Sequence, residues 1–437
     1  MGGQAVFQRL LGFLETAIAG FPDLREGKNR QYGIGDLARA AFAVFFCQSP
    51  SFLAQQKLMQ QAQGRNNGRT LFGIEKLPSD NHIRNHLDPV DPRLLRPVFH
   101  DTARYLYEGK ELDRFRSLGG TLLVALDGTG YFRSESIHCP QCSLTQPKGK
   151  PTVYSHTVVM AAIVAPDIGH VIPLEPEFVV SQDGADKQDC EQRAATRWVQ
   201  QVAPQYSGWD LTIVADDLYA SQPMIQQVLD AEMQYLVTAK EKSHPYLYEE
   251  IQSLEKLGEL HTASHTRWTG KQRLTDNYRW VNGVRLRNSD DSLNVNWVEL
   301  TISDQDGKQR FHTAVITSHL ISQENVQLLL RAARSRWKIE NEDINTLKTK
   351  GYHLEHNFGH GKMFLAQTLL SMNLLAFLFH TVLELQDARC ALIRRTLPRR
   401  ETFFQHLSVL TQYMCFEGWQ QLMVFMLEGL KLSDPDG

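Results

Sequence analysis

Helical spacing of apolar residues marks both ends of the chain. In the first segment, apolar residues recur at three- and four-residue steps, at Phe7, Leu10, Leu11 and Leu14. A second apolar segment runs from Ile34 to Phe46, and residues 403–432 repeat the helical spacing near the C-terminus. We therefore predict helical regions over residues 1–115 and 388–437, the first of them a candidate DNA-binding head.

Between these regions the pattern changes to that of strands. Residues 121–126 form a nearly continuous apolar run that ends in Asp127, and residues 211–215 form another that ends in Asp216 and Asp217. Such runs predict buried strands, each with an acid at its C-terminal end. Further β-rich runs cover residues 153–164, 170–180, 278–286, 293–302 and 310–317.

A late helix carries a further acid. Its predicted cap is Ser322, and its buried stripe is formed by Leu330, Ala333, Trp337, Ile344 and Leu347. Glu340 belongs to the same series, although a buried carboxylate is costly unless a cation or hydrogen-bond donors compensate it. At about 100° per residue, Glu342 points nearly opposite to Glu340, and Asp343 lies about 60° away. Glu340 is therefore either a metal ligand or the partner of Arg336 in a helical ion pair.

The acids at the two strand ends also have structural explanations. Asp216 or Asp217 would cap the following helix, and Asp127 would start a turn beside Gly128. Ligands of open sheets nevertheless gather at strand ends, where converging carboxylates bind hard divalent cations. Two such ions activate a water or a 3′-hydroxyl and stabilise the departing oxygen of a phosphodiester. We therefore predict that Asp127, Asp216 and Glu340 hold two Mg²⁺ (or Mn²⁺) ions.

With these residues the sequence resembles the DDE transposases of bacterial insertion sequences. More narrowly, it resembles the cut-and-paste group whose signature is Tyr, two residues, Arg, three residues, Glu, six residues, Lys. Arg336 and Glu340 fit that spacing. Ala333 stands at the Tyr position and Leu347 at the Lys position, with Lys348 one residue later. The resemblance implies a transposase that cleaves at the ends of an insertion sequence and joins the 3′-hydroxyl ends to target DNA.

The resemblance also implies a fold. The expected class is α/β, with a ribonuclease-H-like catalytic core interrupted by a β-rich insertion and flanked by helical N- and C-terminal regions. The predicted boundaries are 1–115 for the N-terminal region, 116–240 and 321–387 for the two parts of the core, 241–320 for the insertion, and 388–437 for the C-terminal region.

Several basic and aromatic residues are candidates for holding DNA. Arg336 and Lys348 lie within about 80° of Glu340 on an ideal helix and would bind one phosphate. In the insertion, Trp280 and Trp297 lie among arginines and would stack an extruded base, with ordinary hairpin packing as the alternative. The densest positive patch follows at Arg389, Arg394, Arg395, Arg399 and Arg400, either a DNA contact or a solvated helical face.

Cysteines and histidines give a weaker metal signal. Cys139 and Cys142 form a CxxC pair near His156, but a lone pair lacks the second half of a zinc site. A loop with two free thiols is therefore favoured over zinc at Cys139 and Cys142. His353, His356 and His360 are either metal ligands or part of a polar loop near the active site that contacts DNA, and we favour the loop.

Composition and charge say more about the cellular compartment and the kind of partner than about the reaction. The chain has 437 residues, 42% of them hydrophobic, and a net charge of −3, so a nucleic-acid partner has to be held by local patches. Six cysteines without a disulfide pattern, and no export signal, predict a cytoplasmic protein. Residues 364–383 are about as long as a membrane span, but Gln367, Asn373 and His380 interrupt them. We predict a buried core helix there and no membrane partner.

The expected partners are double-stranded DNA and a second copy of the chain. The DNA comprises the terminal inverted repeats and the target, and the dimer forms in the DNA complex. A metal-dependent nuclease without strand transfer is one alternative function. A non-catalytic DNA-binding descendant of a transposase is the other, which the intact acids oppose and the altered Tyr and Lys positions leave open.

Overall fold

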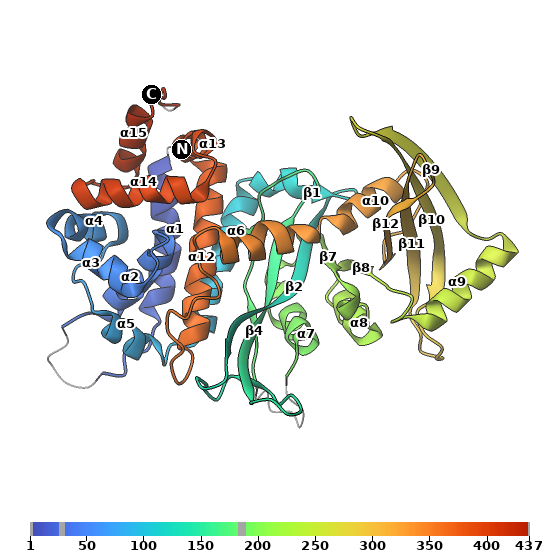
Figure 1. Ribbon diagram of the computed structural model, residues 1–437, viewed down its shortest axis with the longest axis horizontal. Coiled ribbons are helices and arrows are strands. Elements are labelled where there is room, and N and C mark those ends of the chain that lie inside the picture. The colour runs from blue at the N-terminus through green and yellow to red at the C-terminus, as the bar shows by residue number, and fades with distance from the viewer. Residues whose placement is uncertain (1–2, 26–30, 182–188, 436–437) are drawn as a thin grey trace.

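A helical body and a large mixed sheet lie next to each other along the long axis of the molecule (Figure 1). This computed structural model describes residues 3–25, 31–181 and 189–435. The helical body contains both ends of the described chain, and the sheet extends from it to the far end of the molecule. The predicted α/β class with helical flanks is confirmed.

The N-terminal part of the helical body consists of short amphipathic helices. They are α1 (Gly3–Ala19), α2 (Ile34–Phe46), α3 (Phe52–Gln60), α4 (Ala62–Phe72), α5 (Asp80–Leu87), η1 (Pro92–Leu95), α6 (Arg96–Glu108) and η2 (Glu111–Phe115). The predicted stripe of α1 is buried, because Phe7, Leu10 and Leu14 are all 0% exposed. Ser51 and Ser79 cap α3 and α5 by accepting backbone N–H groups.

The C-terminal helices complete the same body. They are α12 (Leu365–Gln386), α13 (Ala388–Thr396), α14 (Arg400–Tyr413) and α15 (Trp419–Gly429). Phe7 of α1 stacks on Trp419 with ring centroids 4.9 Å apart. The Asn67 side chain donates to the Thr411 and Met414 carbonyls and accepts from the Phe416 N–H. The N-terminal helices therefore share one core with the C-terminal helices instead of forming a separate head.

Helix α12 is the centre of this body. It is long and apolar enough to cross a membrane, but 89% of its most apolar window is buried inside the protein. The His380 ring lies between the Tyr352 hydroxyl (2.6 Å) and the Phe46 carbonyl (3.0 Å), and Asn373 donates to the Tyr352 carbonyl. His380 and Asn373 are thus hydrogen-bonded within the protein, as in the predicted core helix.

The sheet has parallel strand pairs at its centre and antiparallel pairs on both sides. Its strand order is β3–β4–β2–β7–β8–β12–β11–β10–β9, in which β2 pairs antiparallel with β4 and parallel with β7, and β7 pairs parallel with β8. The strands up to β8 are β1 (Arg116–Ser117), β2 (Thr121–Ser134), β3 (Ser143–Thr145), β4 (Val153–Val164), β5 (Ile172–Pro173), β6 (Glu177–Val179), β7 (Leu211–Ala215) and β8 (Gln234–Thr238). The helices around them are α7 (Glu191–Gln201), η3 (Ala203–Tyr206), η4 (Asp217–Tyr219) and α8 (Gln222–Asp230).

Strand β2 is longer than its apolar run predicts. The expected end at Asp127 is wrong, because β4 continues to pair with β2 as far as Ser134. The parallel pairing with β7, in contrast, does stop near the acid, with Ala125 opposite Val214 as its last pair. Asp127 therefore lies just beyond the end of the β2–β7 pairing, at a level where β2 still pairs with β4.

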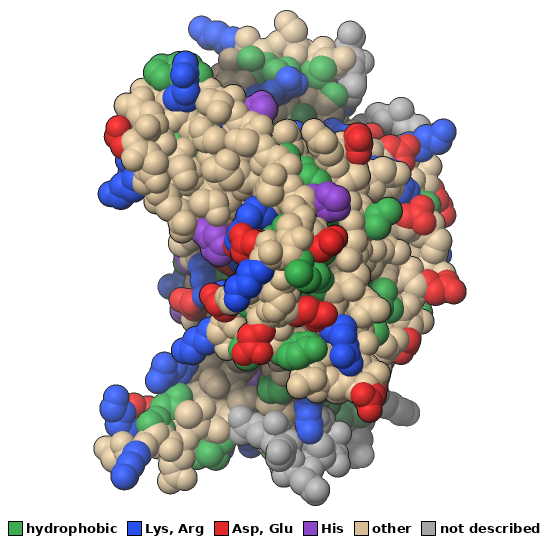
Figure 2. Space-filling model, turned by 90° about the vertical axis from the view of Figure 1, so that its right-hand side faces the viewer, with side chains coloured by type: hydrophobic (Ala, Val, Ile, Leu, Met, Phe, Trp, Pro, Cys, Tyr) green, Lys and Arg blue, Asp and Glu red, His purple; other side chains and the backbone are tan. Residues whose placement is uncertain are grey.

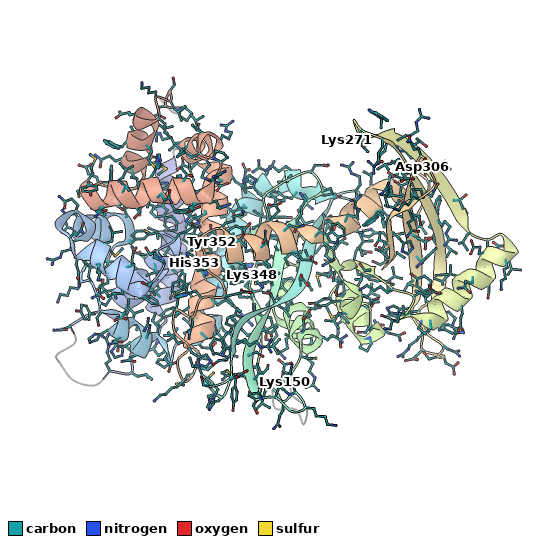
Figure 3. The ribbon with its side chains drawn as sticks, viewed as in Figure 1. Lys150, Lys271, Asp306, Lys348, Tyr352 and His353 are labelled. Carbon is teal, nitrogen blue, oxygen red and sulfur yellow. The ribbon has the colours of Figure 1, made fainter. Side chains whose placement is uncertain are left out.

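Residues 241–320 extend the sheet. They contain α9 (Pro245–Leu257), β9 (His261–Trp268), β10 (Arg273–Arg285), β11 (Asn294–Asp304) and β12 (Gln309–Thr317). Because β12 pairs antiparallel with β8, these strands continue the core sheet. Lys271 and Asp306 mark the tips of the two hairpins (Figure 3). On the face at this end of the molecule, basic and acidic side chains are interspersed (Figure 2).

The predicted late helix is three segments instead of one. Helix α10 (Val326–Arg334) leads through a tight turn to the π-helix η5 (Ile339–Ile344) and to α11 (Asn345–Thr349). Together they form a rod that crosses the core from the insertion to the helical body (Figure 1). A π-turn adds a residue per turn and rotates the next helical segment by about 100°. The predicted stripe is wrong at Trp337, which follows the turn at residues 335–336, and at Glu340 in η5, because both are exposed; Leu330 and Leu347 are buried.

The predicted arginine patch is divided between interior and surface. Arg394 and Arg400 are 11% and 15% exposed and pair with the largely buried Glu384 at 3.0 and 3.1 Å, so in this structure they are engaged inside the protein. Arg395 and Arg399 are exposed. Burial alone would raise the pKa of Glu384, but His170, Arg400 and Arg394 hold that pKa at about 2. The two arginines thus compensate a buried carboxylate where the helical body closes.

Replacing Glu384 leaves two buried guanidiniums without their carboxylate. We expect Glu384→Gln to lower the free energy of unfolding by about 3 kcal/mol. The contribution is present above the ordinary glutamate pKa of 4.5 and is lost as the pH falls toward about 2. Urea unfolding at neutral and acidic pH measures both effects. Arg395→Gln, on the exposed face, is the control and is expected to change stability by less than about 0.5 kcal/mol; equal losses in the two variants would contradict this account.

Candidate functional site

The parallel register of β2 and β7 brings two of the predicted acids together. Ala125 lies opposite Val214, and each strand reaches its aspartate two residues later, Asp127 on β2 and Asp216 after β7. Asp216 Oδ1 also accepts the Leu218 N–H at 2.9 Å and so caps η4. The capping explanation for Asp216 is therefore correct, but it does not remove this carboxylate from the neighbourhood of Asp127.

The adjacent Asp217 points elsewhere. Its two oxygens accept hydrogen bonds from the Lys240 N–H at 2.6 Å and from the Ser243 hydroxyl at 2.5 Å. These bonds tie the start of η4 to the segment after β8. Of the two consecutive aspartates, Asp216 is the one whose charge helps to raise the pKa of Asp127.

The π-helix η5 supplies the next carboxylate. Its residues pack on β2 and β4, and Glu340 stands at its start. Burial and the negative charge of Glu340 raise the pKa of Asp127 to about 7, and Arg336 opposes this rise. Glu191 and Asp216 add smaller effects in the same direction as Glu340. Asp127, Asp216 and Glu340, which are far apart in sequence, thus converge on one region.

Glu191 is a fourth acid of this group that the sequence interpretation missed. It begins α7, and its Oε1 accepts the Tyr219 hydroxyl at 2.8 Å. Gly128 makes room for it: a Cβ on Gly128 would lie 2.1 Å from the Glu191 carboxyl carbon. The available signal was the glycine, because a glycine inside a strand often marks close approach of another group.

Arg336 is the cation that lowers the pKa of Asp127 against the effect of these acids. Its Nη1 donates to Glu340 Oε1 at 2.5 Å, and the Arg336 side chain is 14% exposed, whereas that of Glu340 is 47% exposed. The predicted helical ion pair is therefore present. An exposed carboxylate held by one side chain remains accessible to a second cation, and the guanidinium of Arg336 also suits a phosphate carried by a substrate.

Lys348, on the same rod, forms an ion pair of its own. Lys348 pairs with Glu355 at 2.8 Å and lies near Tyr352 and His353, at the boundary between the helical body and the sheet (Figure 3). Because its ammonium group is held by Glu355, the phosphate site shared with Arg336 stays a prediction. The π-turn between them accounts for the separation, because it changes the face on which α11 presents its side chains.

Asp343, the alternative ligand on this rod, lies in the interior. It is 0% exposed, and neither carboxyl oxygen has a hydrogen-bond partner among the residues that the structure describes. Burial raises the pKa of Asp343 to about 8, so the group is mainly protonated at neutral pH. A neutral carboxyl that is not among the groups acting on Asp127 does not fit a ligand of the same ions.

A cavity of about 640 Å³ adjoins the acids on the insertion side. Asp216 and Arg336 of the core line this cavity. Phe311 of the insertion and Trp337 of the rod line it as well, and their ring centroids are 5.8 Å apart. Trp337 is 44% exposed.

The two tryptophans predicted to stack a base are both buried. Trp280 is 4% exposed and stacks on His261, whereas Trp297 is 0% exposed and packs near Tyr248. Their burial favours ordinary hairpin packing, and the stacking role of Trp297, which also lines this cavity, stays a prediction. Trp337 is the tryptophan that offers an accessible ring beside the acids.

The donor set of the acid site suits hard divalent cations. Carboxylate oxygens are the ligands that Mg²⁺ and Mn²⁺ prefer, and these carboxylates repel one another at close range. The raised pKa of Asp127 records that repulsion together with burial. A cation among Asp127, Asp216 and Glu340 would relieve it, so the residues present fit such an ion.

Comparison with known proteins agrees with this chemistry at the level of the family. The family model described as "Transposase DDE domain" matches residues 143–378, which include Asp216 and Glu340. The search of curated proteins gave no significant match. Among solved structures, the cryo-EM structure of a piggyBac transposase synaptic complex with hairpin DNA matches with a TM-score of 0.40 and 11% identity, over 99% of this chain and 80% of that chain. The family match spans more than half of the sequence, and the chain belongs to the family of transposase DDE domain proteins.

Proposed function

We propose that this protein is a DNA transposase that cleaves at the ends of an insertion sequence and joins the 3′-hydroxyl ends to target DNA. The observation that carries the proposal is the convergence of Asp127, Asp216 and Glu340 from two strand ends and a π-helix. The family implies metal-dependent cleavage and transfer of DNA strands. The core, with antiparallel β2 and β4 followed by parallel β7 and β8, is the part we infer to be ribonuclease-H-like.

In this proposal each residue of the site has a distinct task. Asp127, Asp216 and Glu340 would hold two Mg²⁺ or Mn²⁺ ions, which when bound supply activation of the nucleophile and stabilisation of the leaving oxygen. Arg336 would transfer hydrogen bonds from Glu340 to a phosphate oxygen, because a guanidinium suits both partners. The Tyr219 hydroxyl would keep Glu191 oriented beside Asp127.

The cavity beside the acids is the proposed place for the DNA end. Arg336 lies on its core side, and the exposed ring of Trp337 offers a face on which a displaced base can stack. Arg395 and Arg399 remain candidates for phosphate contacts elsewhere on the surface. The proposed partners are the terminal inverted repeats, the target DNA and a second copy of the chain, in the bacterial cytoplasm.

The cleavage experiment uses DNA that carries the terminal repeats flanking the gene. We expect Mg²⁺-dependent nicking at the repeat ends, and a loss of more than about 100-fold in Asp127→Asn, Asp216→Asn and Glu340→Gln. Asp217→Asn is the matched control, because Asp217 faces the segment after β8. Cleavage without joined products would favour the nuclease, DNA binding without cleavage the non-catalytic descendant, and equal loss in Asp217→Asn would oppose the assignment.

Asp343→Asn distinguishes between the two acids of the rod. Since Asp343 is buried and its pKa is raised to about 8, asparagine resembles the neutral carboxyl already present. We expect this variant to cleave repeat ends at a rate close to wild type, whereas Glu340→Gln is inactive. An inactive Asp343→Asn variant together with an active Glu340→Gln variant, in the same cleavage assay, would show that Asp343 and not Glu340 is the ligand.

The raised pKa of Asp127 predicts how stability depends on pH without metal. Between the ordinary value of 3.8 and about 7, the folded protein holds a proton that the unfolded chain releases, so this group lowers stability as the pH rises. Asp127→Asn should therefore melt at a higher temperature than wild type at about pH 8, and at a similar temperature near pH 4.

Mg²⁺ should reverse the order of the wild-type and Asp127→Asn melting temperatures at about pH 8. In thermal melts at about pH 8, Mg²⁺ is expected to stabilise wild type more than Asp127→Asn, because binding acts through the folded site. A variant that is less stable than wild type without metal, or that gains as much from Mg²⁺, would contradict the proposed role of Asp127.

A further inference from the structure

A second group of metal-ligating side chains lies apart from the acids. Its members come from three places in the chain: Cys139 and Cys142 in the turn after β2, His156 on β4, and His360 in the loop between α11 and α12. All four residues are buried, with exposures between 1% and 9%. The expectations of a loop with free thiols and of a DNA-contacting His360 are therefore incomplete, because the fold brings these residues together.

The distances within this cluster are those of a tetrahedral site. The two Sγ atoms are 3.9 Å apart, and His156 Nε2 lies 3.6 Å from Cys139 Sγ and 3.4 Å from Cys142 Sγ. His360 Nε2 lies 3.3 Å from Cys142 Sγ and 3.1 Å from His156 Nε2. Zinc bonds of about 2.3 Å to sulfur and about 2.0 Å to nitrogen give ligand separations of about 3.8 Å between sulfurs, 3.5 Å for mixed pairs and 3.3 Å between nitrogens.

The surroundings orient the ligands inward. His360 Nδ1 lies 3.1 Å from the Gly361 carbonyl, which fixes the proton on Nδ1 and leaves the Nε2 lone pair directed at the cluster. The rings of Tyr131 and Phe132 pack against His156 and His360, at 5.5 and 4.3 Å between centroids. A buried set of four ligands with an aromatic shell is typical of a closed structural site.

We propose that Cys139, Cys142, His156 and His360 bind one structural Zn²⁺ ion. Thiolate and imidazole ligands in tetrahedral geometry select zinc over the hard cations of the acid site. The sulfurs are too far apart for a disulfide, which needs about 2.05 Å. The sequence showed only half of this site as CxxC, because the other half comes from a strand and from a loop more than two hundred residues later.

The position of the site indicates what the ion does. His156 pairs with Phe132, further along the same β2 strand that carries Asp127. His360 lies in the connection that follows η5 and α11, the rod that carries Glu340. The zinc ion would therefore link the β2–β4 hairpin to the segment after the rod, and so hold the carriers of two proposed active-site acids in one arrangement.

Metal analysis of the purified full chain tests the proposal directly. We expect about one zinc ion per chain by mass spectrometry, retained through gel filtration. Cys142→Ser should lose the ion, and Cys142→His should keep it, since histidine is also a zinc ligand. Cys415→Ser and His138→Gln are matched controls, because both residues are exposed and lie outside the cluster, and they should retain full zinc content.

Cobalt provides a readout that does not depend on activity or on a variant that folds. Chain refolded with Co²⁺ should show the strong visible bands of tetrahedral cobalt with thiolate charge transfer, and these bands should disappear when zinc is added. A wild-type chain that contains no zinc and takes up neither metal on refolding would overturn the proposal, as would unchanged zinc content in Cys142→Ser. Repeat-end cleavage is not part of this test, so a failure of the transposase proposal leaves it intact.

Discussion

Electrostatic repulsion between carboxylates is the constraint on which the rest of the site depends. Burial, together with the negative charges of Glu340, Glu191 and Asp216, raises the pKa of Asp127 to about 7. A cluster of carboxylates of this kind is stable only while a cation or a proton compensates its negative charge. In the protein alone Arg336 does so in part, through its ion pair with Glu340. Much of the surrounding structure serves to hold these like charges in place.

Each carrier of an acid is fixed from outside the site. The β2–β7 register sets the level of Asp127 and Asp216, and the Leu218 N–H and Tyr219 hydroxyl orient Asp216 and Glu191. The rod that carries Glu340 crosses the core and continues into the helical body (Figure 1). There, Tyr352 is tied to α12 through His380 and Asn373. A change in the helical body can thus alter the position of Glu340 without touching the acids.

The sequence predicted the parts of this structure that follow from local periodicity. Apolar runs identified the buried segments of β2 and β7, and helical spacing identified the flanks. The three acids were chosen because ligands gather at strand ends, and the fold places Asp127 and Asp216 at the ends of the β2–β7 pairing. Periodicity failed along this rod, where Trp337 follows the turn at residues 335–336 and is exposed, and where Asp343 in η5 is buried.

Other features depended on contacts that one sequence does not contain. In the sequence, Arg394 and Arg400 belong to a basic patch, whereas in the fold both pair with Glu384 of another helix. The sequence does not show that Trp280 and Trp297 are buried, because their burial depends on how the insertion strands pack in the extended sheet. Glu191 and the Cys139, Cys142, His156 and His360 cluster were missed or halved for the same reason, because their members meet only in the fold.

The central claim is that Asp127, Asp216 and Glu340 together hold divalent cations. Anomalous diffraction from crystals grown with Mn²⁺ tests it most directly, because manganese is located without reference to any activity. We expect manganese peaks within bonding distance of carboxylate oxygens from all three residues, with the Arg336–Glu340 ion pair rearranged. Manganese bound elsewhere, such as at Asp343, with these three carboxylates left without an ion, would contradict the account.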